Sequence, residues 1–338
     1  MTGWGIMGTG RIARRFAEAL AEAPAAQAVA VASRDAERAA TFARDLGLAQ
    51  AYGSYAALLA DPAVRLVYIA LPPSLHATWA TAALQAGKHV LCEKPLATSA
   101  AEVAALLATA HAHGVWLMEG FMYRFHPQTQ AVERLLAEGA LGEVRLVRVA
   151  FGITVADPAN FRFSAELGGG ALGDVGSYCV SMARLVTGQR PVRVSASAQF
   201  TADGVDELLV GTLEYPSGAV AQISCGLRLS RHQRTQIVGS AGSLELDESF
   251  SISADQALTI RLQRGAWRPI AEQISIPAAN HFRREAEAFA ALVAAGDDVH
   301  GLSQMPLNES LDNALTIDAL LCSAREGRAI AIEARPAA

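Results

Sequence analysis

The chain has 338 residues, 51% of them hydrophobic and 18% charged, and carries a net charge of -5 at pH 7. This length exceeds what one hydrophobic core usually serves, so two domains are expected, at residues 1–124 and 125–338. The slightly acidic balance excludes a basic surface for nucleic acid or acidic lipid, and no apolar run approaches the roughly 18 residues that span a membrane. The N-terminus shows no leader pattern, so a cytoplasmic protein with a small-molecule ligand is expected.

A glycine-rich turn follows the first predicted strand, at residues 4–7. The turn Gly8-Thr9-Gly10-Arg11-Ile12-Ala13 precedes a predicted helix at residues 14–23 and has the Gly-x-Gly-x-x-Ala form of the dinucleotide fingerprint. Its glycines permit a tight turn and close approach of a pyrophosphate, and the helix N-terminus offers free N–H groups. The pattern alone is weak evidence, but the order of strand, turn and helix favours it. The predicted cofactor contacts are Gly8, Thr9, Gly10, Arg11 and Ile12.

The end of the second predicted strand, at residues 28–32, bears on the choice between NAD and NADP. An NAD enzyme usually carries an acid there for the ribose hydroxyl, but this chain has Ser33 and Arg34. A hydroxyl and a guanidinium suit a 2′-phosphate, and Arg38 follows one helical turn later. NADP is therefore expected, with NAD less favoured. In the alternative, both arginines are solvated and Asp35, which more naturally caps the following helix, binds the ribose.

Strands and helices continue to alternate through the first third of the chain. The predicted elements are helices at residues 36–46, 54–60, up to 86 and 99–113, and strands at 66–71, ending at 94, and at 115–119. This alternation is typical of a doubly wound parallel sheet, the Rossmann arrangement. Leu71, Pro72 and His76 follow a strand end and are predicted to contact the cofactor or the substrate. For His76, a solvated loop histidine is an equal alternative.

The triplet Glu93-Lys94-Pro95 closes one of these strands. A residue before proline is pushed toward extended geometry, so Lys94 should lie at the carboxyl edge of the sheet, where open α/β sheets bind ligands. By itself the triplet is more often a surface lysine after an ordinary strand. The dinucleotide pattern around it favours a functional lysine.

The second half is predicted to be an α+β domain. Helices at residues 127–138, from Gly168-Gly169-Gly170 to 186, at 282–295 and at 308–326 accompany strands at 144–154, 192–200, 207–215, 220–227, 234–238 and further segments up to 276. Many strands with few helices favour a large, mainly antiparallel sheet with helices on one side and an open, apolar face on the other. Asp174 lies near a helix start, after glycines that let backbone approach a ligand.

Four motifs taken together resemble a known family. They are Gly8 to Ala13, Glu93-Lys94-Pro95, Glu119-Gly120-Phe121-Met122-Tyr123-Arg124-Phe125-His126-Pro127, and Gly168 to Tyr178. Their order and spacing resemble the glucose-fructose oxidoreductase, inositol dehydrogenase and rhizopine-catabolism (Gfo/Idh/MocA) family. Within it, the branch of NADP-linked D-xylose dehydrogenase and dimeric dihydrodiol dehydrogenase is the most similar, because Tyr178 stands where many members have histidine. The resemblance implies that Lys94 and Asp174 are catalytic and that the Lys94-Pro95 bond is cis. It also implies that the open sheet face forms a homodimer or a dimer of dimers.

A dehydrogenase must release a hydroxyl proton while a hydride leaves the same carbon for the nicotinamide. Lys94 is predicted to be the main acid/base or an electrostatic anchor, Tyr178 the proton relay, and Asp174 the group that holds the lysine. Which of the lysine and the tyrosine exchanges the proton directly stays open. Glu93 is expected beside the cofactor. Arg162 resembles a family residue near the cofactor phosphates, with an inter-domain salt bridge as the alternative.

The substrate pocket is expected between the end of the Lys94 strand and the Asp174 helix, lined by Met122, Phe125, Phe151, Phe163, Tyr178 and His281. Such a lining suits a ring with one polar edge, and no arginine cluster suggests a phosphate. At Met122 the similar branch has tryptophan; its loss widens the pocket and puts an aromatic substrate in doubt. The prediction is an NADP-linked enzyme for a neutral sugar or cyclic polyol, such as an aldose oxidised at its first carbon. A trans-dihydrodiol or a keto sugar is the alternative substrate.

Other classes fit the sequence less well. A short-chain dehydrogenase would carry Tyr-x-x-x-Lys, which is missing, and a zinc alcohol dehydrogenase would need a cysteine and histidine ligand set. The four cysteines are scattered, so no metal site is predicted. A non-catalytic NADP-binding sensor is an alternative of another kind, which the joint presence of Lys94, Asp174 and Tyr178 disfavours.

Overall fold

The computed structural model describes residues 2–23, 26–265, 267–296, 301–302 and 305–333. The chain forms two compact units, one of Met1–Phe125 and Asn280–Leu311, the other of His126–Ala279 and Asp312–Ala338. The chain therefore passes from one unit to the other three times. The expected boundary after residue 124 falls one residue from the first of these passages.

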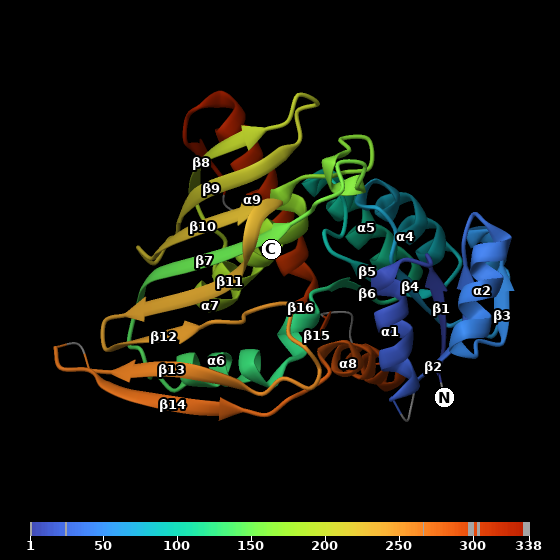
Figure 1. Ribbon diagram of the computed structural model, residues 1–338, viewed down its shortest axis with the longest axis horizontal. Coiled ribbons are helices and arrows are strands. Elements are labelled where there is room, and N and C mark those ends of the chain that lie inside the picture. The colour runs from blue at the N-terminus through green and yellow to red at the C-terminus, as the bar shows by residue number, and fades with distance from the viewer. Residues whose placement is uncertain (1, 24–25, 266, 297–300, 303–304, 334–338) are drawn as a thin grey trace. The chain divides into compact units, whose positions relative to one another are not determined.

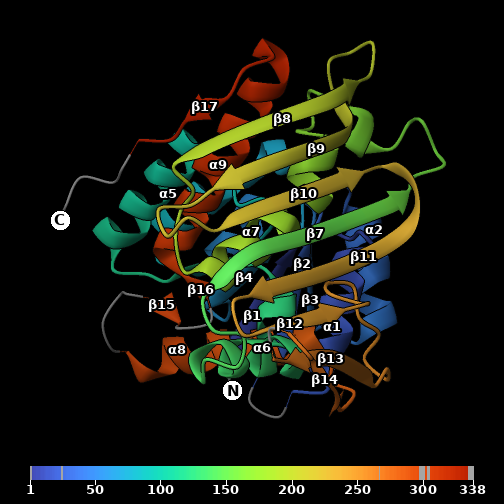
Figure 2. The same cartoon turned by 90° about the vertical axis from the view of Figure 1, so that its left-hand side faces the viewer.

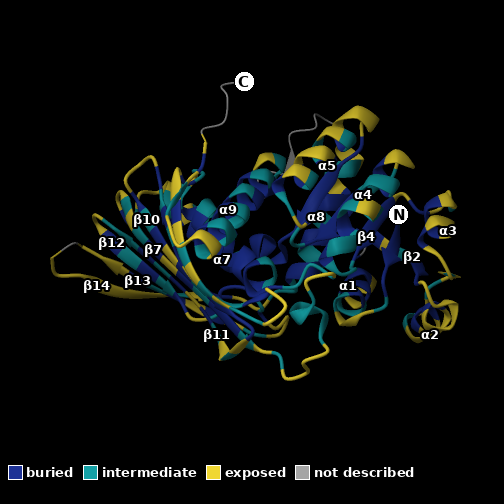
Figure 3. Ribbon diagram, turned by 90° about the horizontal axis from the view of Figure 1, so that it is seen from above, coloured by how far each residue is buried: buried dark blue, intermediate teal, exposed yellow. Residues whose placement is uncertain are grey.

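The first unit is built on a parallel sheet with the strand order β3-β2-β1-β4-β5-β6, and every neighbouring pair is parallel (Figure 1). Its strands are β1 (Thr2–Met7), β2 (Ala26–Ala32), β3 (Gln50–Tyr52), β4 (Leu66–Ile69), β5 (His89–Glu93) and β6 (Leu117–Gly120). Strand β4 is buried along its whole length, as a central parallel strand must be (Figure 3). Strand β3 was not predicted, because it has only three residues and they are mostly exposed.

The helices of this unit are α1 (Arg11–Ala21), α2 (Ala36–Leu46), α3 (Tyr55–Ala60), α4 (His76–Gln85), α5 (Ala100–His113) and α8 (His281–Ala295). Short 3-10 turns, η1 (Pro73–Leu75) and η2 (Met122–Phe125), and the strand pair β15 (Gly301–Leu302) and β16 (Met305–Pro306) complete it. Helix α2 has the predicted bounds. Its ends follow from local chemistry, since the Asp35 side chain caps the start and Gly47, with a φ of +69°, ends it.

Helix α8 comes from the far part of the chain but covers the core of the first unit. The ring of Phe289 in α8 lies 5.8 Å from that of Trp4 in β1, and Trp4 lies 5.2 Å from Phe16 in α1. The predicted domains, 1–124 and 125–338, place α8 in the second domain, whereas the structure places it in the first unit. Local patterns identify the helix but do not show which core it covers.

The second unit is built on a nine-stranded sheet with the order β14-β13-β12-β11-β7-β10-β9-β8-β17 (Figure 2). Its strands are β7 (Val144–Thr154), β8 (Arg193–Phe200), β9 (Asp206–Glu214), β10 (Val220–Gly226), β11 (Arg228–Gly239), β12 (Gly242–Leu246), β13 (Leu258–Arg264), β14 (Ile270–Ile276) and β17 (Ile330–Ala331). Among these named strands, neighbours run antiparallel except for β7 and β10, so the predicted mainly antiparallel sheet is confirmed.

Helices cover one face of this sheet. They are α6 (Pro127–Ala137), α7 (Ser177–Thr187), which follows a π-helical turn at Leu172–Gly176, and the part of α9 (Leu307–Glu326) that begins at Asp312; a short turn, η3, spans Phe161–Phe163. The Leu320 side chain of α9 lies against Gly211 in β9, and the Ser323 hydroxyl accepts a hydrogen bond from the Ala196 N–H at 3.0 Å.

The opposite face carries no helix among the described residues (Figure 2). A run of hydrogen bonds crosses its central strands, from Gln222 of β10 to Arg148 of β7, Gln236 of β11, Glu245 of β12 and Arg261 of β13. The face is hollowed there by about 530 Å³. The face that was expected to be apolar therefore carries a polar run beside apolar side chains such as Val210 of β9, which is 52% exposed.

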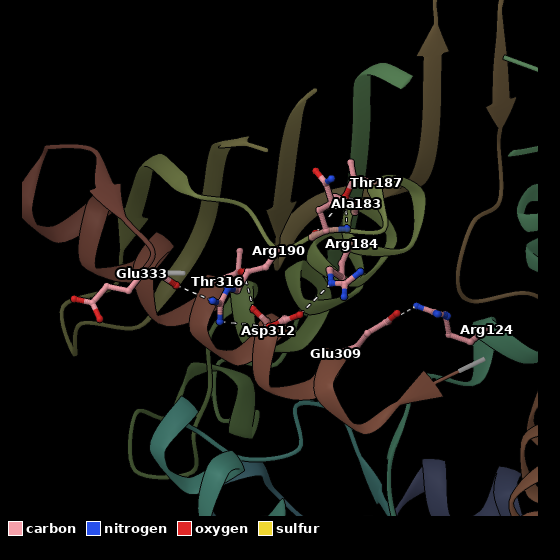
Figure 4. A network of polar contacts seen from close by, with 10 residues as sticks. Arg124, Ala183, Arg184, Thr187, Arg190, Glu309, Asp312, Thr316 and Glu333 are labelled. Atoms are coloured by element: carbon pink, nitrogen blue, oxygen red, sulfur yellow. Dashed lines mark hydrogen bonds and ion pairs between the residues drawn. The ribbon is translucent and has the colours of Figure 1, made fainter. Parts of the chain in front are cut away.

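Ion pairs hold the residues of α9 within each unit, as Figure 4 shows. In the first unit, Arg124 Nη1 lies 2.9 Å from Glu309 Oε2. In the second, Asp312 accepts from Arg184 Nε at 3.2 Å and lies 3.5 Å from Arg190 Nη1. No helix among the described residues has both the length and the apolar character to cross a membrane.

Candidate active site

The glycine-rich turn excludes a side chain at its first glycine and leaves space at the second. Gly8 has a φ of +108°, and a Cβ there would lie 2.5 Å from the Ala70 carbonyl oxygen. No described atom lies within 4 Å of the place that a Cβ on Gly10 would take, and Gly10 caps α1 without a side-chain bond. The N–H groups of the first helical turn, which holds Arg11 and Ile12, are therefore accessible to an anion such as a pyrophosphate.

Asp35 is committed to the N-terminus of α2. Its Oδ1 accepts from the N–H groups of Glu37 and Arg38 at 3.0 and 3.1 Å. Since both bonds go to one carboxylate oxygen at a helix start, the side chain serves the cap that the sequence predicted. Both bonds use Oδ1, and Asp35 lines the hollow beside the turn, so ribose binding by Asp35 stays an alternative prediction.

Basic and hydroxyl groups gather around the same loop. Ser33 Oγ accepts from the Asp35 N–H at 3.2 Å. Burial raises the pKa of the Tyr55 hydroxyl, and the exposed Arg34 guanidinium opposes this shift. A hollow of about 380 Å³ lies beside it, lined by Thr9, Arg14, Asp35, Glu37, Arg38, Thr41 and Phe42. The turn residue Thr9 and the helix residue Arg38 thus face one cavity.

His76 is buried at the start of α4, and both ring nitrogens face backbone carbonyls. Nδ1 lies 2.8 Å from the Pro95 oxygen, and Nε2 lies 2.8 Å from the Leu71 oxygen. Carbonyls only accept, so a neutral ring donates to one of them and an imidazolium to both. Burial lowers the pKa of His76, and the two carbonyls oppose this shift. The ring therefore joins the Leu71-Pro72 loop to the segment after β5.

Lys94 directly follows β5, at the carboxyl edge of the parallel sheet, and its bond to Pro95 is cis, as the resemblance implied. The preceding Glu93 is buried, and its Oε1 accepts from the Tyr68 hydroxyl of β4 at 2.5 Å. The side chain of Glu93 is therefore held by the neighbouring strand.

Glu119, in β6, is a buried carboxyl that opens one of the four sequence motifs but was given no role in the predicted site. Its Oε1 accepts from the Leu96 N–H at 2.9 Å, two residues after the lysine. Burial raises the pKa of Glu119 to about 7, although the Ser310 hydroxyl, the Leu96 N–H and the charge of Lys94 lower it. A carboxyl that changes charge near neutral pH thus lies beside the predicted catalytic lysine.

Three predicted substrate residues are buried in the first unit. Met122 and Phe125 lie in η2, and His281 is the first residue of α8, which packs against η2. Arg284 Nε of α8 donates to the Phe125 carbonyl at 2.9 Å.

In the second unit, Asp174 lies in the π-helical turn and pairs with Arg162. The distance from Arg162 Nε to Asp174 Oδ2 is 2.5 Å, and Nη2 lies 3.5 Å from Oδ1. Both predicted site residues are thus brought together within this unit. The guanidinium of Arg162 is engaged by the aspartate that was expected to hold the lysine.

The start of the helix that carries Asp174 is held by Asp206 of β9, which the sequence did not mark. Its Oδ2 accepts from the Leu172 N–H at 2.7 Å, and burial raises its pKa to about 6. Gly170 has a φ of +136°, and a Cβ there would lie 2.3 Å from Asp206 Oδ1. This glycine makes room for a carboxylate of the chain itself.

Tyr178 of α7 belongs to a buried cluster of three aromatic rings. Its ring centroid lies 5.5 Å from that of Phe151 and 5.3 Å from that of Phe250, and these two rings are stacked at 5.3 Å. Phe163 instead lies under the Arg228 guanidinium, 4.7 Å from the ring centroid. Of the substrate residues predicted in this unit, the structure brings Phe151 and Tyr178 together.

Comparison with known proteins agrees with this arrangement. Residues 2–121 match the model of the oxidoreductase family with an NAD-binding Rossmann fold, and residues 129–245 match the GFO/IDH/MocA C-terminal domain. The chain belongs to the Gfo/Idh/MocA oxidoreductase family. The predicted family and fold class are thus confirmed.

Among its relatives, the D-xylose 1-dehydrogenase (NADP(+)) 2 of Haloferax volcanii is 40% identical over 332 residues, 98% of this chain and 99% of that protein. The trans-1,2-dihydrobenzene-1,2-diol dehydrogenase of Xenopus tropicalis is 38% identical over 248 residues, 72% and 75% of the two chains. The solved structure of KijD10, a 3-ketoreductase from Actinomadura kijaniata in complex with NADP and TDP-benzene, is 34% identical. It has a TM-score of 0.88 and covers 95% of this chain and 97% of that one. The two relatives that cover nearly the whole chain are thus an NADP-linked sugar dehydrogenase and a ketoreductase solved with NADP.

Proposed function

We propose that this protein is an NADP-dependent oxidoreductase that transfers a hydride to or from a hydroxyl or carbonyl carbon of a neutral sugar or cyclic polyol. The similarity to an NADP-linked D-xylose dehydrogenase over 98% of the chain carries this proposal. A lysine at the carboxyl edge of the parallel sheet supports it, because ligands of such sheets bind at that edge.

The residues around the glycine-rich turn suit NADP. The space at Gly10 and the uncapped first turn of α1 would accept the pyrophosphate, and Ser33, Arg34 and Arg38 would bind the 2′-phosphate. Once bound, the nicotinamide would accept the hydride in alcohol oxidation and donate it in carbonyl reduction.

The hydroxyl proton of the substrate is proposed to be transferred by side chains of this protein. We assign Lys94 to take the hydroxyl proton, directly or through Tyr178, as the carbonyl forms, and to return it in reduction. The pair of Asp174 with Arg162 fixes the aspartate, which supports an orienting role for Asp174 rather than a role in proton transfer. The rings that contact Tyr178 limit its freedom, which suits a relay of fixed position.

The substrate is proposed to be uncharged and cyclic. The candidate residues Met122, Phe125, Phe151, Phe163, Tyr178 and His281 carry aromatic, sulfur and imidazole groups, and such linings bind rings with one polar edge. The dihydrodiol dehydrogenase and ketoreductase among the relatives keep a trans-dihydrodiol and a keto sugar as second candidates.

A substrate panel tests the proposal. Pentoses, hexoses, inositols, a trans-dihydrodiol and sugar phosphates are each incubated with NADP or NAD, and reduced cofactor is followed by its absorbance. Turnover of neutral aldoses or polyols is expected. Turnover of sugar phosphates or simple aliphatic alcohols alone would contradict the proposed substrate class.

Removing Arg34 should weaken the preference for NADP. A guanidinium bound to the 2′-phosphate contributes roughly 1.5 to 3 kcal/mol, so the parent should favour NADP by about tenfold or more in kcat/KM. Arg34→Ala should lower that ratio, with kcat/KM for NAD unchanged. Arg44→Ala is the matched control, because Arg44 is also exposed but lies in the last turn of α2, away from the loop that holds Ser33 and Arg34. If the parent used both cofactors equally well, the NADP prediction would be wrong, and the alternative in which Asp35 binds the ribose would be favoured.

We further propose a homodimer, or a dimer of dimers, through the helix-free face of the nine-stranded sheet. An uncovered sheet face is commonly covered by two-fold pairing, and Val210 is exposed there beside the hydrogen-bonded side chains of the central strands. Val210→Asp should shift the mass measured by light scattering toward the monomer. Val192→Asp is the control, because this exposed valine directly precedes β8, outside the hollow. A monomeric parent at micromolar concentration would refute the proposal.

A further inference from the structure

The segment that carries Lys94 is held from two sides by buried ionisable side chains. His76 contacts the carbonyl of Pro95, and Glu119 accepts the N–H of Leu96. The two residues that follow Lys94, Pro95 and Leu96, are therefore each held by a hydrogen bond to their backbone. This fixes the point from which the lysine side chain extends.

Glu119 also acts on the lysine through its charge. It is 4% exposed, so its interaction with nearby charges is screened less than at a surface. The positive charge of Lys94 favours the ionised carboxylate, whereas Glu309 disfavours it. Glu309 is itself paired with Arg124, and the Ser310 hydroxyl also favours the ionised form of Glu119. Lys94 is thus the cation that stabilises the Glu119 carboxylate.

We propose that Glu119 is a positioning residue for Lys94: it holds the lysine-bearing segment through Leu96, and its negative charge attracts the lysine ammonium group and so fixes where that group lies. This inference rests on the proposed function, in which Lys94 exchanges the substrate proton. Glu119 does not touch the substrate in this proposal and acts only through the lysine.

The two contributions can be separated by substitution. Glu119→Gln keeps an oxygen that can accept the Leu96 N–H but removes the charge, whereas Glu119→Ala removes both. Because glutamine has the shape of glutamate, the first variant should fold even if the second is unstable. Glu102→Gln is the matched control, since Glu102 is a surface carboxylate on α5 that binds Thr98.

The decisive measurement is kcat and KM between pH 5.5 and 9. In the parent, kcat for carbonyl reduction should fall as pH is lowered through one protonation step near pH 7, because the neutral carboxyl no longer attracts the lysine ammonium group. Glu119→Gln should lack this step and have a kcat at pH 8 at least fivefold lower, with both KM values within twofold. Glu102→Gln should match the parent. A profile for Glu119→Gln that keeps the step and the parental kcat would overturn the inference.

Hydrogen exchange at the Leu96 amide separates this inference from the proposed function. Protection should be retained in Glu119→Gln and lost in Glu119→Ala, whatever the substrate is. A parent without turnover on the substrate panel would refute the proposed function. Equal protection of Leu96 in both variants would instead refute the positioning role.

Discussion

Replacing Lys94 with alanine should lower kcat by about 100-fold or more, because a positioned proton-transfer group typically contributes that much to the rate. The loss should be as large in kcat/KM as in kcat, since such a group acts mainly in the transition state. NADP affinity, measured by quenching of protein fluorescence, should change less than threefold. A variant that keeps a third of the parental rate would remove Lys94 from the catalytic group.

The sequence offers a matched control for this experiment, because Lys88 is the only other lysine. Its Nζ donates to the carbonyls of Asp61 and Val64 at 2.9 and 2.7 Å, on the stretch before β4. Lys88→Ala should therefore lower thermal stability but leave kcat within twofold. Tyr178→Phe should be milder than Lys94→Ala if the tyrosine is a relay, and equal losses would make the tyrosine the proton donor.

Glu119→Gln should also become more stable relative to the parent as pH rises. A folded-state pKa of about 7, against 4.5 for an ordinary glutamate, favours folding while the carboxyl is protonated, and this contribution is lost as pH rises through 7. The shift corresponds to about 3 kcal/mol, of which about 2 kcal/mol falls between pH 5.5 and 8.5. Glutamine does not titrate, so it avoids the cost of the buried charge.

Urea unfolding of both proteins at the two pH values measures this difference. Other buried acids, such as Asp206, titrate in both proteins and cancel. The free energy of unfolding of Glu119→Gln minus that of the parent should therefore increase from pH 5.5 to 8.5. A difference that stays constant would show that Glu119 is not ionised in this range.

Elements with a strong local signal were predicted well. The bounds of α2 and β7 agree with the prediction because an N-cap, a terminal glycine and a long apolar alternation mark them. Helix α1 begins at Arg11, three residues before the prediction, because Gly10 already caps it. The sequence could not show which unit an element joins when its partners are far away along the chain. The residues of the Arg124–Glu309 pair, for example, are 185 positions apart.

The candidate site divides in the same way. The glycine-rich turn and Lys94 carry recognisable local patterns, so sequence reasoning finds them. Asp206 carries no such pattern, and the motif that begins at Glu119 does not show what Glu119 does, because the contribution of both residues comes from burial and from backbone N–H groups far away in sequence. A buried histidine with two carbonyl partners, as at His76, likewise looks like any loop histidine until the chain is folded.

The return of α8 to the first unit has a consequence for synthesis of the protein on the ribosome. Phe289, which covers Trp4, is translated 285 residues after it. At translation rates of about 5 to 20 residues per second, the ring of Trp4 awaits this partner for roughly 15 to 60 s. The strands made first therefore belong to a core that closes among the last, and during that interval the nascent chain exposes an aromatic surface that a chaperone can bind.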